Sequence, residues 1–192
     1  MASIIPESTD DGRADSGRLT RIVVTGSEST GKTRLAEQLA AHYGVPWVPE
    51  FARDYAEQKG GSLTSTDVTP IGSGQITRED AATRGLTGMI VLDTDLVSTV
   101  VYSEQYYGSV PAWIPIAAKE RLADLYLVCD IDLPWVADTA RDAQHQRRQM
   151  HDSFIQHLTR YGTTYQLVSG TGAERLSRAI AYIDSRSTLL LP

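Results

Sequence analysis

Short apolar runs alternate with longer stretches of helical period from about Leu19 onward. The apolar runs show little polar alternation, which is typical of strands buried on both faces of a parallel sheet. The predicted strands are 21–24, 45–48, 89–92, 125–129 and 165–168. The stretches between them carry apolar residues three and four positions apart, as amphipathic helices do. This alternation predicts an α/β fold, with five parallel strands and helices on both faces of the sheet.

The expected helices occupy the intervals between the strands, and several end at a glycine, which readily adopts the left-handed turn of a helix end. They cover 32–43, 50–59, 75–84, a stretch from 96 with one apolar stripe, 111–123, a stretch ending at 161, and a last one around 176–183. Residues 62–74 are polar and glycine-rich, so we expect a long loop with a function of its own. Residues 1–18 offer little to bury, which predicts a disordered leader before one domain, 19–192.

The first strand is followed by the sequence Gly-Ser-Glu-Ser-Thr-Gly-Lys-Thr at positions 26–33. This is the pattern of a phosphate-binding loop, in its required place between a strand and a helix. The glycines let backbone N–H groups approach the phosphates, the lysine reaches the β- and γ-phosphates, and the last hydroxyl is placed for Mg²⁺. The chain is therefore predicted to bind a nucleoside triphosphate with Mg²⁺. The predicted nucleotide ligands in this segment are Gly26, Glu28, Ser29, Thr30, Gly31, Lys32, Thr33 and Arg34.

Two carboxylates, Asp93 and Asp95, follow the third predicted strand. Ligands of open α/β sheets bind beyond the carboxyl ends of the strands, so these side chains should face the phosphate loop. Mg²⁺ prefers carboxylate and hydroxyl oxygen, and we predict that Asp93 and Thr33 hold the metal. Asp95 has two open roles: it binds substrate beside Asp93, or it caps the helix that follows.

Glu50 follows the second predicted strand, where a kinase needs a base or an anchor for the acceptor hydroxyl. Arg53 comes three residues later, on the same face of a helix. Both are predicted to bind substrate, and Glu50 or Asp93 is predicted to take the hydroxyl proton. The alternative for Glu50 and Arg53 is an ion pair on the helix surface.

Residues 134–148 are polar and contain three arginines, a composition typical of a lid over a phosphoryl-transfer site. Cations that close over the developing charge supply much of the catalysis in such reactions. Arg141 is the predicted catalytic arginine. Arg147 and Arg148 are candidates for ATP binding, although neighbours on a helix cannot face the same way. Trp135 is the candidate to stack on a heterocycle, and the alternative for the arginines is a solvated basic helix start.

The overall charge disfavours a nucleic-acid partner, because the 192 residues carry a net charge of −6 and no basic stripe. No apolar run is long enough to span a bilayer, and residues 1–18 do not have the pattern of a signal peptide. Cys129, the single cysteine, lies in an apolar run and is expected to be an inert buried thiol. We expect a cytoplasmic protein without membrane or nucleic-acid partners, and the sequence indicates no particular oligomeric state.

Together these motifs resemble the nicotinamide riboside kinase domain of the NadR family. The resemblance covers nearly the whole chain from Leu19 and rests on residues 26–33, 49–55, Gln75 ahead of 93–95, 134–136 with Arg141, and 170–175. It implies a stand-alone, AAA-type phosphate-loop kinase with a three-layer fold and a helical lid. It also implies that MgATP phosphorylates the ribose 5′-hydroxyl of nicotinamide riboside, giving nicotinamide mononucleotide for NAD biosynthesis.

Two other functions stay open at this point. A kinase for another nucleoside or small hydroxyl compound would use the same residues. A regulatory ATPase that signals to a partner would need the phosphate loop, but it would not require Glu50 and Arg53.

Overall fold

The computed structural model describes residues 18–133 and 146–190. Its strands are β1 (Leu19–Thr25), β2 (Trp47–Val48), β3 (Gly88–Asp93), β4 (Leu125–Cys129) and β5 (Tyr165–Val168). They form one sheet in the order β2-β3-β1-β4-β5, and every neighbouring pair is parallel. The predicted α/β fold with five parallel strands is therefore confirmed. The predicted leader, apart from Arg18, and most of the predicted lid lie outside the described residues.

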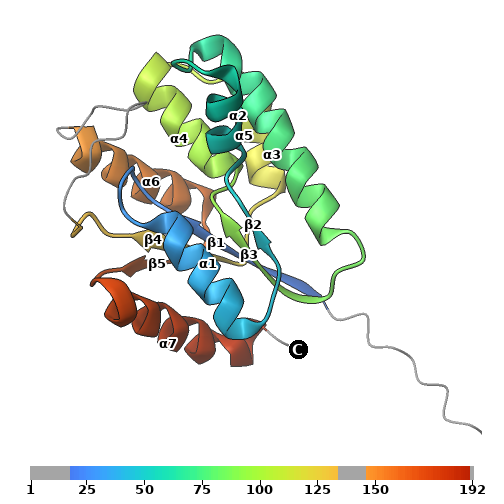
Figure 1. The fold of residues 1–192 in the computed structure, drawn as a ribbon, viewed down its shortest axis with the longest axis vertical. Helices are drawn as coiled ribbons and strands as arrows, with labels where there is room; N and C mark the ends of the chain where they lie inside the picture. The colour runs from blue at the N-terminus through green and yellow to red at the C-terminus, as the bar shows by residue number, and fades with distance from the viewer. Residues whose placement is uncertain (1–17, 134–145, 191–192) are drawn as a thin grey trace, which may run out of the picture.

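Helices cover both faces of this sheet, as Figure 1 shows. They are α1 (Lys32–Tyr43), α2 (Phe51–Lys59), α3 (Val68–Thr83), α4 (Leu96–Tyr107), α5 (Trp113–Glu120), α6 (Arg147–Tyr161) and α7 (Gly172–Leu190), with a short 3-10 helix at Ser65–Asp67. Helices α1 and α7 pack on one face, and α3 to α6 lie on the other. Among the described residues, no helix is both long and apolar enough to cross a membrane.

The apolar core is divided between the two faces of the sheet. Ile22 and Val24 of β1 pack with Leu39 of α1, whereas Val23 between them packs with Val97 of α4. All five side chains are fully buried. Because successive strand residues point to opposite faces, a strand covered by helices on both sides has to be apolar throughout.

Residues 62–74 were predicted to be a loop, and this prediction was wrong, because most of them lie in the 3-10 helix and α3. Pro70 falls in the first turn of α3, where its missing N–H removes no helical hydrogen bond. Gly72 and Gly74 allow close helix packing: a Cβ on Gly74 would lie 2.2 Å from the ring of Phe51. Glycines that suggested a loop therefore mark contacts between helices.

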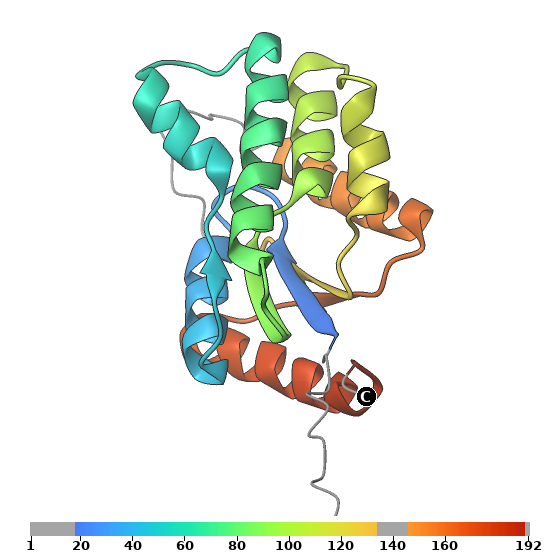
Figure 2. The ribbon, with the colours of Figure 1, turned by 90° about the vertical axis from the view of Figure 1, so that its right-hand side faces the viewer.

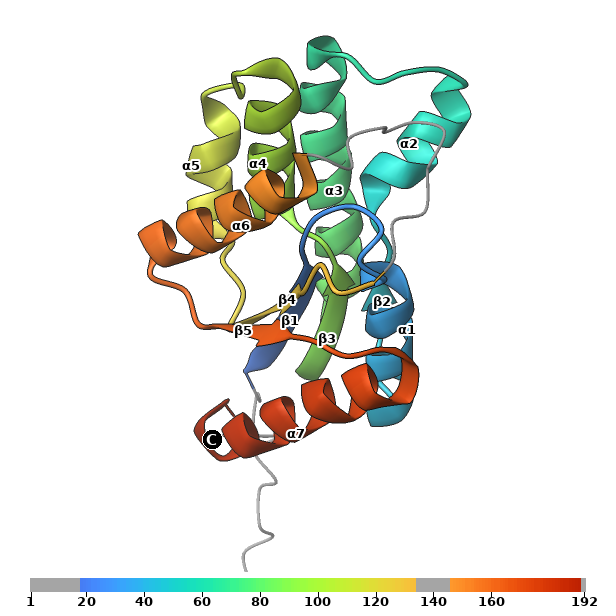
Figure 3. The same ribbon diagram turned by 90° about the vertical axis from the view of Figure 1, so that its left-hand side faces the viewer.

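The sheet topology brings separate segments to one edge. The carboxyl ends of β1, β2 and β3 lead into the phosphate loop, the start of α2 and the start of α4. Figures 2 and 3 show the loop after β1 at the upper end of that strand, the end of the sheet toward which helices α3 and α4 lie. This is the edge at which open α/β sheets bind their ligands.

Gly26, the first residue after β1, packs so closely against β4 that there is no room for a side chain. Its φ is +133°, and a Cβ there would lie 2.9 Å from the carbonyl oxygen of Cys129. We expect Gly26→Ala to lower the free energy of unfolding by about 2 kcal/mol or more, since strained backbone alone costs roughly 1–3 kcal/mol. Urea unfolding measures this. The matched control is Gly61→Ala, whose Cβ meets nothing within 4 Å; equal losses in the two variants would contradict the expectation.

Candidate functional site

Residues 26–31 form a tight loop between β1 and α1. Ser29 and Gly31 adopt left-handed conformations, with φ of 55° and 75°, and the Thr30 hydroxyl donates to the Ser27 carbonyl at 2.7 Å. Such turns aim successive N–H groups into one concavity, and the start of α1 adds its positive dipole end. The segment therefore has the geometry of an anion site.

Lys32 lies over this loop and is almost fully buried, with 9% of the residue exposed. Its Nζ donates to the Ser27 carbonyl at 2.9 Å and to the Tyr102 hydroxyl at 3.3 Å. The Tyr102 hydroxyl in turn donates to the Gly26 carbonyl at 3.0 Å. The lysine ammonium is thus held beside the loop by neutral oxygens.

Two tyrosines of α4 belong to the site, and neither was predicted from the sequence. Tyr106, one turn after Tyr102, donates to the carboxylate of Glu28 in the phosphate loop. The Tyr102 and Tyr106 rings stack, with centroids 6.2 Å apart and planes 3° apart. Their spacing of four residues was visible in the sequence, but the apolar stripe of the same helix indicated only core packing.

Asp93 ends β3 and is 1% exposed, and neither of its carboxylate oxygens has a hydrogen-bond partner among the described residues. Burial raises its pKa to about 6; the Thr33 hydroxyl and the charges of Lys32 and Arg53 oppose this rise, while Glu50 adds to it. These four groups therefore lie close enough to Asp93 to affect its charge. Unused carboxylate oxygens beside a hydroxyl are a donor set that suits Mg²⁺.

Asp95 takes the capping role. Its Oδ1 accepts from the backbone N–H groups of Val97 and Ser98, and its Oδ2 accepts from the Tyr126 hydroxyl at 2.6 Å. Burial raises the pKa of Asp95 to about 6. Thr94 has a φ of +66°, which turns the chain between the two aspartates. Both oxygens of Asp95 are used inside the protein, so the predicted substrate contact has no support here.

Glu50 immediately precedes α2 and is only 8% exposed. It occupies the N-cap position, yet its carboxylate makes no capping hydrogen bond. Arg53 is exposed on the same helix. Burial of Glu50 argues against the alternative of an ion pair on the helix surface.

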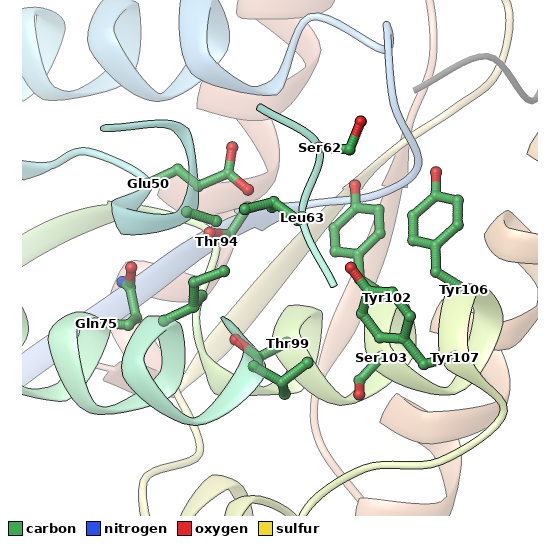
Figure 4. A pocket seen from close by; sticks show the side chains of 13 residues that line it. Glu50, Ser62, Leu63, Gln75, Thr94, Thr99, Tyr102, Ser103, Tyr106 and Tyr107 are labelled. Atoms are coloured by element: carbon green, nitrogen blue, oxygen red, sulfur yellow. The ribbon is translucent and has the colours of Figure 1, made fainter. Parts of the chain in front are cut away.

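A pocket of about 230 Å³ opens beside the phosphate loop (Figure 4). It is lined by Glu50, Ala52, Ser62, Leu63, Val68, Ile71, Gln75, Thr94, Thr99, Tyr102, Ser103, Tyr106 and Tyr107. Tyr102 is also hydrogen-bonded to the phosphate loop, so the pocket and the loop share a wall. An apolar, aromatic cavity with a few polar groups is typical of a site for a small organic molecule.

The segment that carries Ser62 and Leu63 is anchored at its end by Asp67. This carboxylate accepts from the Thr64 N–H at 2.7 Å and from the Lys59 ammonium at 2.5 Å. The lysine and these hydrogen bonds hold the pKa of Asp67 well below its usual range. The pocket wall between α2 and α3 is thereby tied to both helices.

Of the arginines predicted to bind ATP, Arg147 is the one that contacts the phosphate loop in the part of the chain that the structure describes. Arg147 is 8% exposed and donates to the carbonyls of Leu133 at 2.8 Å and Ser29 at 3.2 Å, whereas Arg148 is exposed. Arg34, which was also predicted to bind ATP, is exposed as well. The predicted residues Trp135 and Arg141 lie outside the described residues.

Arg175 is a buried site residue to which the sequence analysis assigned no role. Its Nε donates to the Gly170 carbonyl at 2.8 Å, and its guanidinium also donates to the Thr30 carbonyl and pairs with Asp132. It therefore joins the loop after β5 to the phosphate loop. Residues 170–175 contribute to the NadR resemblance, but the sequence pattern did not indicate which groups Arg175 contacts.

Asp93 leads to a prediction about stability and pH. Because its pKa is raised when folded, the folded state binds this proton more tightly, and stability falls as pH rises from about 4 to 6. Asp93→Asn removes this cost, so we expect it to stabilise the protein at pH 7.5 by up to about 3 kcal/mol, with little gain at pH 4. Thermal unfolding without Mg²⁺ at both pH values measures this. A variant less stable than wild type at pH 7.5 would contradict it.

The chain matches a known protein family and is similar to curated proteins. The model of an AAA domain (AAA_28) matches residues 21–175, which include the phosphate loop, Glu50, Asp93 and Arg175. The chain is also similar to the trifunctional NAD biosynthesis/regulator protein NadR of Escherichia coli (strain K12) and of Salmonella typhimurium (strain LT2). Each is 29% identical over 124 residues, covering 62% of this chain and 30% of the relative. The chain thus spans about a third of the length of these curated relatives.

Solved structures share the fold. A NadR protein in complex with NR has a TM-score of 0.70 at 22% identity, over 92% of this chain and 51% of that one. A NadR protein in complex with NAD and AMP-PNP has a TM-score of 0.70 at 23% identity, over 90% and 50%. Thymidylate kinase from Ehrlichia chaffeensis has a TM-score of 0.64 at 15% identity, over 86% and 98%. The NadR resemblance and the α/β fold with a five-stranded parallel sheet that the sequence predicted are both confirmed.

Proposed function

We propose that this chain, which belongs to the AAA domain family, is an ATP-dependent kinase that phosphorylates the ribose 5′-hydroxyl of nicotinamide riboside. The observation that carries the proposal is the pocket beside the phosphate loop, which has Glu50 in its wall and Tyr102 in contact with Lys32. A hydroxyl compound in this pocket would lie next to phosphates held by the loop. The product would be nicotinamide mononucleotide.

The relatives support this choice of substrates. The NadR proteins are named for NAD biosynthesis, and the two solved NadR structures contain NR in one case and NAD with AMP-PNP in the other. The solved NadR structure with NR matches over 92% of this chain with a TM-score of 0.70. A riboside acceptor and an adenine nucleotide donor are therefore the substrates that we assign to this site.

In the proposed reaction, the loop N–H groups and Lys32 hold the β- and γ-phosphates. Asp93 and Thr33 would hold Mg²⁺, which neutralises phosphate charge when it is bound. Glu50 orients the acceptor hydroxyl and takes its proton. The hydroxyl oxygen bonds to the γ-phosphorus as the bond between that phosphorus and the bridging oxygen breaks, which releases ADP.

Cations and aromatic rings complete the proposed site. Arg147 lies against the Ser29 carbonyl, where a guanidinium can offset charge on the transferring group. Arg141 and Trp135 keep their predicted roles as catalytic arginine and stacking ring, and the cytoplasm stays the predicted location. Tyr106 and Tyr107 give the acceptor pocket aromatic surface for a flat heterocycle.

The regulatory ATPase is less consistent with the site. Hydrolysis alone needs no cavity for a second substrate, yet one adjoins the phosphate loop and includes a buried carboxylate. A kinase for a different nucleoside remains the alternative within the same chemistry.

Lys32→Ala tests the proposal directly. We expect it to reduce phosphoryl transfer to nicotinamide riboside at least 10³-fold, because the only side-chain cation in the phosphate-loop motif is lost. The assay measures nicotinamide mononucleotide formed from ATP. Lys119→Ala is the matched control, since this lysine is exposed on α5, and it should keep wild-type turnover.

A panel of acceptors with the wild-type protein separates the alternatives. Transfer to nicotinamide riboside with the highest kcat/KM supports the proposal. Transfer to a deoxynucleoside but not to nicotinamide riboside would show that the acceptor is a different nucleoside. ATP hydrolysis at one slow rate, whatever nucleoside is present, would favour the regulatory ATPase instead.

A further inference from the structure

We infer that Gln75 and Arg78 of α3 form a clamp that holds Glu50 in position for phosphoryl transfer. Gln75 is then a positioning residue, which acts through the backbone of α2 on the carboxylate that takes the acceptor proton. The inference rests on the proposed function for the role of Glu50. The contacts themselves do not depend on it.

The clamp begins at the backbone N–H of Phe51, the first residue of α2. The first N–H groups of a helix have no partner within the helix and are usually satisfied by a side chain at the N-cap. Here Glu50 occupies that position without capping, and the Phe51 N–H donates to Gln75 Oε1 at 3.0 Å. An amide from another helix thus satisfies a group at the helix start, and the Glu50 carboxylate can line the pocket.

The orientation of the Gln75 amide is set by Glu79. Gln75 Nε2 donates to Glu79 Oε1 at 2.9 Å, and Glu79 is 1% exposed. Arg21 and Arg121 lie 2.6 and 3.6 Å from Glu79 Oε2, so this carboxylate is balanced by positive charge and accepts hydrogen bonds only. The amide nitrogen must therefore face Glu79 and the amide oxygen must face α2.

Arg78 holds the chain on the other side of Glu50. Its Nη1 donates to the Pro49 carbonyl at 3.3 Å, and its Nη2 pairs with Asp54 of α2 at 2.7 Å. Its guanidinium lies 4.9 Å from the centroid of the Phe51 ring. The residues directly before and after Glu50 are thus both bonded to α3.

Precise placement of Glu50 is what the proposed reaction requires. A base must lie within hydrogen-bond reach of the proton that it takes, and a shift of about 1 Å can cost roughly 10²-fold in rate. Figure 4 shows Glu50 and Gln75 from different elements on the same side of the pocket. Helix α3 therefore does more than line the pocket, because its polar side chains determine where the carboxylate is.

A double-mutant cycle between Gln75→Leu and Glu50→Gln tests the clamp. We expect Gln75→Leu to lower kcat about 10- to 100-fold with little change in the KM for ATP. In the Glu50→Gln background the same substitution should change kcat less than threefold, because a misplaced base is already lost. Losses that multiply independently would overturn the inference, since Gln75 would then act on the substrate or on the fold as a whole.

Arg78→Ala provides a second variant, and it should give the same non-additive pattern with Glu50→Gln. Because Arg78 is partly exposed, its loss is compatible with folding even if Gln75→Leu unfolds the protein. Thr77→Ala is the control: the hydroxyl of this exposed residue donates to the Ser73 carbonyl within α3, and its variant should keep wild-type kcat. Multiplicative losses for Arg78→Ala would also overturn the clamp.

Amide hydrogen exchange tests the contacts without any assay of activity. Gln75→Leu should speed exchange at the Phe51 amide at least tenfold, whereas Thr77→Ala should leave it unchanged. An unchanged Phe51 amide in a folded Gln75→Leu variant would overturn the clamp. If wild-type protein phosphorylates no nucleoside, the proposed function fails, and this measurement still decides whether the clamp exists.

Discussion

The site depends on one constraint: the carbonyl groups of the phosphate loop need hydrogen-bond donors on the side that faces away from the phosphates. A loop that presents N–H groups to an anion turns carbonyls outward, where each needs a donor. Four carbonyls between Gly26 and Thr30 receive side chains from α4, α1, α6 and α7. Helices distant in sequence are thereby tied to one loop, and the pocket beside the loop shares the wall that α4 contributes.

The same edge of the sheet carries two buried carboxylates, Asp93 and Glu50. Neither oxygen of Asp93 has a hydrogen-bond partner in the part of the chain that the structure describes, and Glu50 is buried at a helix start whose first N–H bonds to Gln75. Buried carboxylates reduce stability unless they are paired. Their cost is consistent with a site whose partners, a metal ion and an acceptor hydroxyl, arrive with the substrates. Asp95, two residues later, differs from Asp93, because both of its oxygens accept hydrogen bonds, one from the start of α4 and one from Tyr126.

Local patterns predicted the strands and the phosphate loop well. The bounds of α1, β4 and β5 agree with the structure, because apolar runs and glycine ends act over a few residues. Residues 62–74 show where this reasoning fails. The glycine at 74 allows an approach by Phe51 of α2, and a contact between helices leaves no signature in the composition of one segment. The roles of Tyr102 and Arg175 were missed for the same reason, since their partners lie 76 and 145 residues away.

Residue order alone was sufficient for the fold class, the phosphate loop, and the expectation that Glu50 and Asp93 meet at one edge, because parallel strands all deliver their carboxyl ends there. It left open whether Asp95 binds or caps, which of two neighbouring arginines faces the loop, and what holds Glu50. In the folded chain, the Tyr126 hydroxyl donates to Asp95 and Arg147 donates to the Ser29 carbonyl. Gln75 accepts from the first N–H of α2, directly after Glu50. Motifs arise from chemistry between neighbours along the chain, whereas the direction in which a buried polar group points depends on partners that only packing brings within hydrogen-bond distance.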